Sequence, residues 1–243
     1  MALTPLDVLN GLLGLSFVII SIILGLIIAF KYFKNKDKNF ILIGFAWVFI
    51  TSGWYGTSFS FLFALILGGE GLPFEAIMLL NFIPLPIGLL LWLTVFTNFM
   101  YKKKQKLVLI SISVITFIFY IMFFYFLFTN PILVGEKISP VDTKGNNWVL
   151  LLYLVLFILI FLITGVKFSL KTITIDNPET KLKGKLLLIA FISFSIGSVL
   201  DSMVPSTALT LIIFRLILIS SAIEFYGGFI LPKWIKKFLL KQS

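Results

Sequence analysis

The sequence predicts an all-α membrane protein in which seven transmembrane helices form one bundle, and two observations lead to this fold class. First, 60% of the residues are hydrophobic and only 12% are charged, whereas about 25% charged residues is typical of soluble domains. Second, 17 of the 20 basic residues occupy alternate gaps between seven apolar stretches, two occupy the other gaps, and Arg215 lies inside a stretch. Because basic residues favour the cytoplasmic side of a membrane, we expect a multi-pass protein of the cell membrane.

The seven predicted spans each contain roughly 19 residues or more, enough at 1.5 Å per residue to cross a hydrocarbon core of about 30 Å. They cover residues 9–30, 40–67, 76–100, 107–129, 148–166, 186–204 and 207–231. The second span is long and is expected to tilt. The fourth has little polar content beyond tyrosines, which favours a position facing lipid.

The charges that flank the spans predict an orientation with the amino terminus outside and the carboxyl terminus in the cytoplasm. Asp7 and no basic residue precede the first span, and four lysines follow it. A cleavable signal peptide would carry its positive charge at the other end. The same rule makes Lys167–Lys185 the longest cytoplasmic loop.

We expect a seven-helix transmembrane domain over residues 1–232 and a basic amphipathic cytoplasmic tail over residues 233–243. The tail is expected to lie on the inner leaflet, where anionic lipid headgroups attract each basic residue by roughly 1 kcal/mol. An anchor that only fixes the topology is the alternative. The apolar residues at helical spacing in and just before the tail are Leu231, Trp234, Ile235, Phe238 and Leu239, and the lysines of the tail are Lys233, Lys236, Lys237 and Lys241. Nucleic acid is not an expected partner, because the lysines flank spans instead of forming one patch.

The residue types that are missing exclude several kinds of membrane enzyme. The chain contains no cysteine and no histidine, which removes thiolate chemistry, haem held by two histidines and histidine-based acid–base catalysis. The last span contains no lysine that could hold retinal. We therefore expect no catalytic residue, no metal and no cofactor, and we do not expect an enzyme.

Two charged residues in the last two spans are candidate functional residues, because a charge at mid-bilayer costs at least ~2.5 kcal/mol. Asp201 lies near the outer end of the sixth span, and Arg215 lies about two and a half turns into the seventh. The short Pro205–Ser206 connection makes the two helices antiparallel neighbours, so the pair is expected to form an ion pair. It either locks the helix pair together or shares one partner with an anionic or zwitterionic ligand.

Glu224 is a separate candidate, because nine residues after Arg215 it points to the opposite side of the seventh span. Ser220, Ser221, Gly227 and Gly228 surround it and form a face suited to close helix contact. A carboxyl group there acts as a proton-coupled switch or as a neutral hydrogen-bond donor.

Polar and aromatic residues of the second and third spans predict a cavity that opens outward. Trp54 and Tyr55 lie in the second span, and Asn81 lies in the third beside Pro84 and Pro86, which free backbone carbonyls. We expect these residues to line a cavity between spans two, three, six and seven. Ordinary helix packing is the alternative for each of them.

The stretch from NPETKLKGK to ISSAIEFYGGFILPKWIKK, together with GWYGTSFSF, LLWL and YKKKQK, resembles a group of uncharacterised seven-span membrane proteins from archaea. That group is distantly similar to the seven-helix sensor regions that precede some histidine kinases. The resemblance implies no established activity. Because this chain lacks a kinase domain, a signal would leave through a separate cytoplasmic partner.

The functional expectation is a receptor- or sensor-like protein whose outward cavity binds a small amphiphilic or lipid-like ligand. In this hypothesis Arg215 and Asp201 hold the polar end of the ligand, Trp54, Tyr55 and Asn81 line the cavity, and Glu224 lies at a moving helix contact. A transporter with a proton-coupled Glu224 and a scaffold without a ligand remain alternatives.

Overall fold

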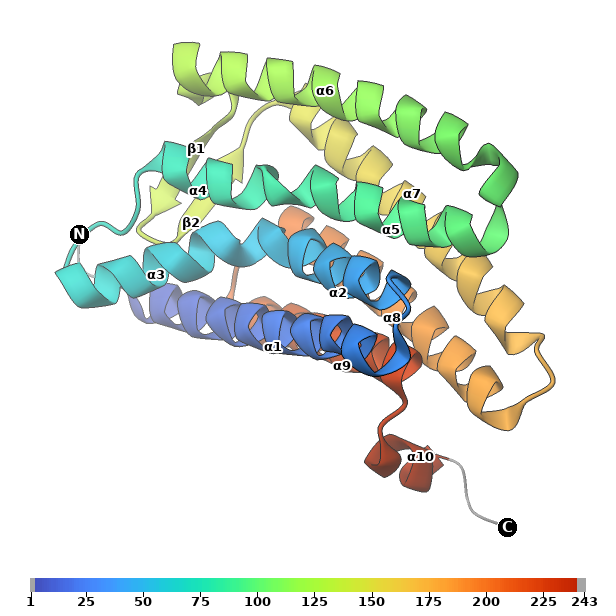
Figure 1. Ribbon diagram of the computed structural model, residues 1–243. Helices are drawn as coiled ribbons and strands as arrows, with labels where there is room; N and C mark the ends of the chain where they lie inside the picture. The colour runs from blue at the N-terminus through green and yellow to red at the C-terminus, as the bar shows by residue number, and fades with distance from the viewer. Residues whose placement is uncertain (1–2, 240–243) are drawn as a thin grey trace.

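The computed structural model describes residues 3–239, which fold into long helices that lie side by side and one small β-hairpin (Figure 1). Its elements are α1 (Pro5–Asn35), α2 (Asn39–Ile50), η1 (Thr51–Trp54), α3 (Tyr55–Leu67), α4 (Phe74–Phe82), α5 (Pro84–Met100), η2 (Lys102–Lys104), α6 (Gln105–Thr129), η3 (Pro131–Leu133), β1 (Gly135–Ser139), β2 (Asp142–Gly145), α7 (Trp148–Ile173), α8 (Pro178–Met203), α9 (Ala208–Ile230) and α10 (Lys233–Leu239). Seven helical segments of the described chain are long and apolar enough to cross a membrane. The predicted fold class is confirmed.

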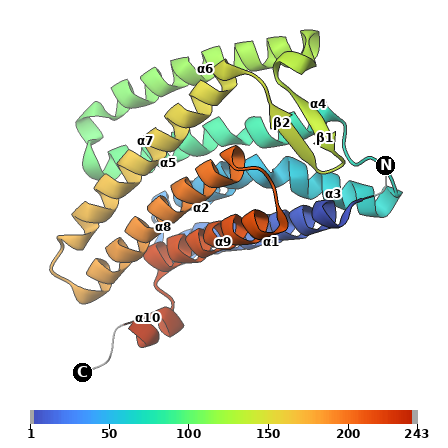
Figure 2. The same ribbon diagram turned by 180° about the vertical axis from the view of Figure 1, so that it is seen from behind.

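The connections between spans gather at two opposite ends of the bundle (Figures 1 and 2). The lysine end carries the α1–α2, α5–α6 and α7–α8 connections and α10, which together with the adjoining helix ends hold most of the basic residues. The hairpin end carries the first described residues, the α3–α4 loop, the β-hairpin and the α8–α9 turn. The charges are therefore separated as the sequence indicates, and the direction in which the bundle crosses the membrane stays a prediction.

The second and third spans are each broken, where the sequence predicts continuous helices. A 3₁₀ turn, η1, separates α2 from α3, and the carbonyl oxygen of Val48 accepts hydrogen bonds from Tyr55 (2.6 Å) and Thr51 (3.0 Å). The third span breaks at Ile83, just before Pro84. Ser52 donates to the carbonyl oxygen of Asn81 over 2.8 Å. These bonds satisfy backbone groups that cannot find water inside a membrane.

The hairpin is fixed against the α3–α4 loop, and the sequence did not reveal it. β1 and β2 pair antiparallel, with Glu136 opposite Lys144. The ammonium group of Lys137 donates to the carbonyl oxygens of Glu70 and Leu72. The hydroxyl group of Ser60 donates to the carbonyl oxygen of Pro140. The hairpin therefore closes one end of the bundle as an ordered cover.

The described part of the tail forms a short helix that packs only one apolar side chain against the bundle. Ile235 is buried, whereas Trp234 and Phe238 are exposed. Lys236 forms an ion pair with Glu179 at the start of α8. Lys241, predicted to belong to the same helix, lies outside the described residues. The exposed rings are available to the membrane surface, as the amphipathic pattern predicts.

Close approach of α1 and α2 depends on two glycines. A Cβ atom at Gly44 would overlap the carbonyl oxygen of Gly25, and a Cβ at Gly25 would lie 2.6 Å from a methyl group of Val48. Small residues allow helix backbones to approach in membranes, where packing replaces the hydrophobic effect as the attraction.

We predict that Gly44→Val destabilises the protein by about 1–3 kcal/mol, because the added side chain forces the two backbones apart. Thermal unfolding in detergent measures the effect. Gly53→Ala is the matched control, since a Cβ at Gly53 meets no atom within 4 Å. Equal unfolding temperatures for the two variants would contradict the close helix contact.

Candidate functional site

Four side chains from four spans meet near the hairpin end, and we call them the Arg215 network: Asn10, Trp54 and Arg215, which are buried, and Asp201, which is partly buried. The guanidinium Nη2 of Arg215 donates to Asn10 Oδ1 over 2.9 Å and lies 3.4 Å from Asp201 Oδ2. The indole nitrogen of Trp54 donates to the same Asp201 oxygen over 2.7 Å. The guanidinium also lies 5.8 Å from the Trp54 ring centroid, within cation–π range. The predicted ion pair is thus confirmed.

The 3₁₀ turn η1 positions the tryptophan of this network. Trp54 ends η1, and its backbone (φ −109°, ψ 0°) departs from helical geometry before α3 begins. Its ring lies edge-on to Phe17 of α1 at 4.9 Å and to Phe194 of α8 at 5.9 Å, so packing holds the indole in place. A 3₁₀ segment inside a helix often marks a functional hinge. Here the break directs the indole nitrogen to α8.

A large cleft lies beside this network, and we call it the hairpin-end cleft. Its volume is about 1380 Å³, and it is bounded by the start of α1, by α4, the β-hairpin, the start of α7, the α8–α9 turn and Leu211 of α9. Asp7, Asn10, Asp142 and Asp201 are among its polar lining residues. A cleft of this size exceeds the range of about 300–1,000 Å³ that is usual for small-molecule pockets.

The predicted site residues divide into two groups around this cleft. Asp201 and Asn81 line it, whereas Trp54, Tyr55 and Arg215 do not. Trp54 and Arg215 lie directly behind Asp201, and the Tyr55 hydroxyl is used inside the second span. The lining differs from the predicted one, because the second span contributes no residue to it, while the first and fifth spans and the hairpin do.

Asn81 lines the cleft and also forms hydrogen bonds that connect two spans. Its Oδ1 accepts a hydrogen bond from the backbone nitrogen of Gly56 over 2.6 Å, and its backbone oxygen accepts the Ser52 hydroxyl. A Cβ at Gly56 would lie 2.8 Å from the Asn81 side chain. The asparagine therefore joins the second span to the third.

Glu224 lies on the α8-facing side of α9, away from the Arg215 network. Its Oε1 accepts the Ser220 hydroxyl over 2.7 Å, and its Oε2 is buried without a hydrogen-bond partner among the described residues. One turn further along, a Cβ at Gly228 would overlap Leu187 of α8. The expected small-residue helix contact is present, and its motion stays a prediction.

The sequence did not indicate three further polar residues of the cleft: Asp7, Asn10 and Asp142. Asn10 follows Asp7 by about one turn at the start of an apolar stretch, which is the one signal that would have found it. Asp142 begins β2 outside the spans and faces charges from three helices. Burial raises its pKa above the ordinary value, the Thr143 backbone bond and Arg215 lower it, and Asp201 and Asp7 raise it further.

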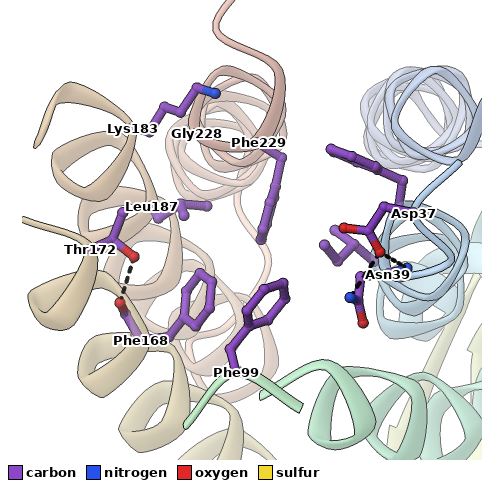
Figure 3. A pocket seen from close by; sticks show the side chains of 11 residues that line it. Asp37, Asn39, Phe99, Phe168, Thr172, Lys183, Leu187, Gly228 and Phe229 are labelled. Carbon is purple, nitrogen blue, oxygen red and sulfur yellow. Dashed lines mark hydrogen bonds between the residues drawn. The ribbon is translucent and has the colours of Figure 1, made fainter. Parts of the chain in front are cut away.

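A smaller pocket of about 180 Å³ lies at the lysine end, between α2, α5, α7, α8 and α9 (Figure 3). The rings of Phe99, Phe168 and Phe229 point into it, and Asp37 and Lys183 lie at its margins. The aromatic core separates this pocket from the hairpin-end cleft; Trp47 stacks on Phe225 within that core at 4.2 Å.

Comparison with models of known protein families and with curated proteins produced no match. The seven-helix architecture of the chain is established, and the resemblance to uncharacterised seven-span membrane proteins from archaea, clearest over 177–237, stays a prediction. The function must therefore be argued from the residues of the cleft and of the network.

We predict strong coupling between Asp201 and Arg215 in a double-mutant cycle. Arg215→Met should destabilise the protein by about 3–5 kcal/mol, because it leaves a buried carboxylate without its counter-charge. Adding Asp201→Asn should recover much of that loss, since the neutral amide needs no counter-charge. Unfolding in detergent measures all four species. Additive effects would disprove the pairing, and the exposed Lys181–Asp176 pair serves as a control without coupling.

We also predict that the carboxylate of Asp142 makes the folded protein less stable as pH rises. Its pKa in the folded state lies above 3.8, which is the value taken for the unfolded chain. At pH values between the unfolded-state pKa and the folded-state pKa, the folded state binds more protons than the unfolded state, so stability falls as pH rises. Asp142→Asn removes this loss. The variant should therefore unfold at a higher temperature than the parent at pH 7, with the difference vanishing below pH 3.8. Parallel unfolding temperatures at every pH would refute the prediction.

Proposed function

We propose that this seven-helix membrane protein is a receptor- or sensor-like protein that binds a small amphiphilic ligand in the hairpin-end cleft. The single observation that supports this function is the direct attachment of the cleft to the Arg215 network. Asp201 and Asn10 face the cleft and also hold Arg215. A ligand that contacts either residue therefore acts on buried contacts that join four spans.

The sixth and seventh spans provide the route from the cleft to the lysine end. α8 runs from the 174–177 connection to Asp201, and α9 runs from the hairpin end to α10. The two helices pack closely, with Gly197 against Ile217 and Leu218, and Gly228 against Leu187. The Lys236–Glu179 ion pair links α10 to the start of α8. A relative shift of α8 and α9 would thus change the surface offered to a cytoplasmic partner.

The absence of native cysteine permits a direct test with a single label. We predict that Leu151→Trp, which partly fills the cleft, changes the emission of an environment-sensitive fluorophore attached at Lys237→Cys on α10. Leu152→Trp is the matched control, because Leu152 is equally exposed on α7 but does not line the cleft. Emission that responds to neither substitution would contradict coupling between the two ends and favour the scaffold.

A transporter is the second candidate, and the lysine-end pocket together with Glu224 favours it. Two openings at opposite ends of one bundle, with a partly buried carboxyl group between them, are the parts that alternating access requires. Proton flux into proteoliposomes, followed with a trapped pH dye, separates the candidates. Proton flux that occurs with the parent protein and is abolished in Glu224→Gln would support the transporter and contradict the receptor.

A further inference from the structure

We propose that the hairpin-end cleft recognises an amphiphile with an ammonium head group. This inference rests on the proposed ligand-binding function and specifies the chemical class of the ligand. Three carboxylates, Asp7, Asp142 and Asp201, line the cleft, while among the described residues Lys144 alone adds a positive side chain to the lining. The cleft therefore has the charge that attracts a cation.

Arg215 forms an ion pair with only one of these carboxylates, that of Asp201, and within residues 3–239 those of Asp7 and Asp142 have no ion-pair partner. It is only 4% exposed, it is not a lining residue, and its contacts to Asn10 and Asp201 both use Nη2. An anionic ligand would have to pass the lining carboxylates to reach the guanidinium. A cationic ligand meets the carboxylates first.

Two of the carboxylates retain an oxygen that can accept a further hydrogen bond. Asp201 uses Oδ2 for both Trp54 and Arg215, and within residues 3–239 its Oδ1 has no hydrogen-bond partner. Asp142 uses Oδ1 for the backbone nitrogen of Thr143, and its Oδ2 has none in the same range. The two residues belong to α8 and β2. An ammonium group between them would donate charge-assisted hydrogen bonds to both carboxylates.

The walls above these carboxylates suit an apolar body. Met78 and Phe82 of α4 face the cleft together with Leu150 and Leu154 of α7. The side chains at the margin are exposed, Leu151 by 55% and Met203 by 72%. This side lies along helices that cross the membrane, so the cleft opens towards the hydrocarbon layer. A ligand with a hydrocarbon chain can enter there.

The cost of the unpaired Asp142 charge supports the same ligand class. Burial raises the pKa of this carboxyl group, which means that its ionised form is unfavourable in the folded protein. A bound cation would relieve that cost. A bound anion would increase it.

The test uses the full chain in lipid nanodiscs and three probes with the same eight-carbon tail: octylammonium, 1-octanol and octanoate. Equilibrium dialysis, with empty nanodiscs subtracted, measures binding. We expect the cation to bind at least about tenfold more tightly than either other probe, as one charge-assisted hydrogen-bond equivalent provides. Equal or tighter binding of octanol or octanoate would overturn the proposal.

Asp142→Asn provides the residue-level test. It should weaken binding of octylammonium about tenfold without weakening octanoate. Among residues 3–239 the Asp142 side chain forms a hydrogen bond only with the backbone of Thr143, so the variant removes no hydrogen bond of the Arg215 network. Glu136→Gln is the matched control, since it neutralises an exposed carboxylate on the other strand that does not line the cleft. Unchanged cation binding in Asp142→Asn would refute the assignment.

Two sources of the ammonium group can be separated by competition. Displacement of octylammonium by phosphatidylethanolamine, but not by phosphatidylglycerol, identifies a lipid headgroup, and failure of both lipids to displace it identifies a free amine. The test is also distinct from that of the receptor. If the cation binds but the emission of the fluorophore on α10 stays constant, the receptor function is refuted and the ligand class stands. If octanoate changes that emission and the cation does not, the ligand class is refuted and the receptor function stands.

Discussion

The buried contact between Arg215 and Asp201 is the constraint on which the arrangement of the hairpin end depends. An arginine inside a membrane is costly unless its charge is matched. Here the match comes from α8, a neutral acceptor comes from Asn10 of α1, and Trp54 of η1 holds the carboxylate from a third side. One charge therefore fixes the relative positions of four spans.

The broken second span and the hairpin each place a side chain near this contact. The 3₁₀ turn η1 directs Trp54 towards α8, and the hairpin brings Asp142 to the same region without joining the buried pair. The charge of the site is therefore unevenly distributed. Its inner part is neutralised and packed, and its outer part, which faces the cleft, retains excess negative charge.

The sequence was sufficient for the features that follow from hydropathy and charge. The seven spans, the lysine end and the pairing of Asp201 with Arg215 could be predicted because the membrane limits where charge can lie and the short α8–α9 turn forces two helices together. The cleft lining could not be predicted. It depends on Asn10 and Asp142, which are distant in sequence and reach the site through the entry angle of α1 and the fold of a hairpin that shows no strong turn signal.

The Arg215 network also has a consequence for biosynthesis. Asn10 and Arg215 are separated by 205 positions, so α1 leaves the ribosome long before the guanidinium that binds its amide is made. Asp201 precedes Arg215 by only 14 positions, and it has no counter-ion until α9 is made and inserted. Insertion of the seventh helix is thus the event that completes the bundle, and a chain that stalls before it carries an unmatched acid by which membrane quality control can distinguish it from the finished protein.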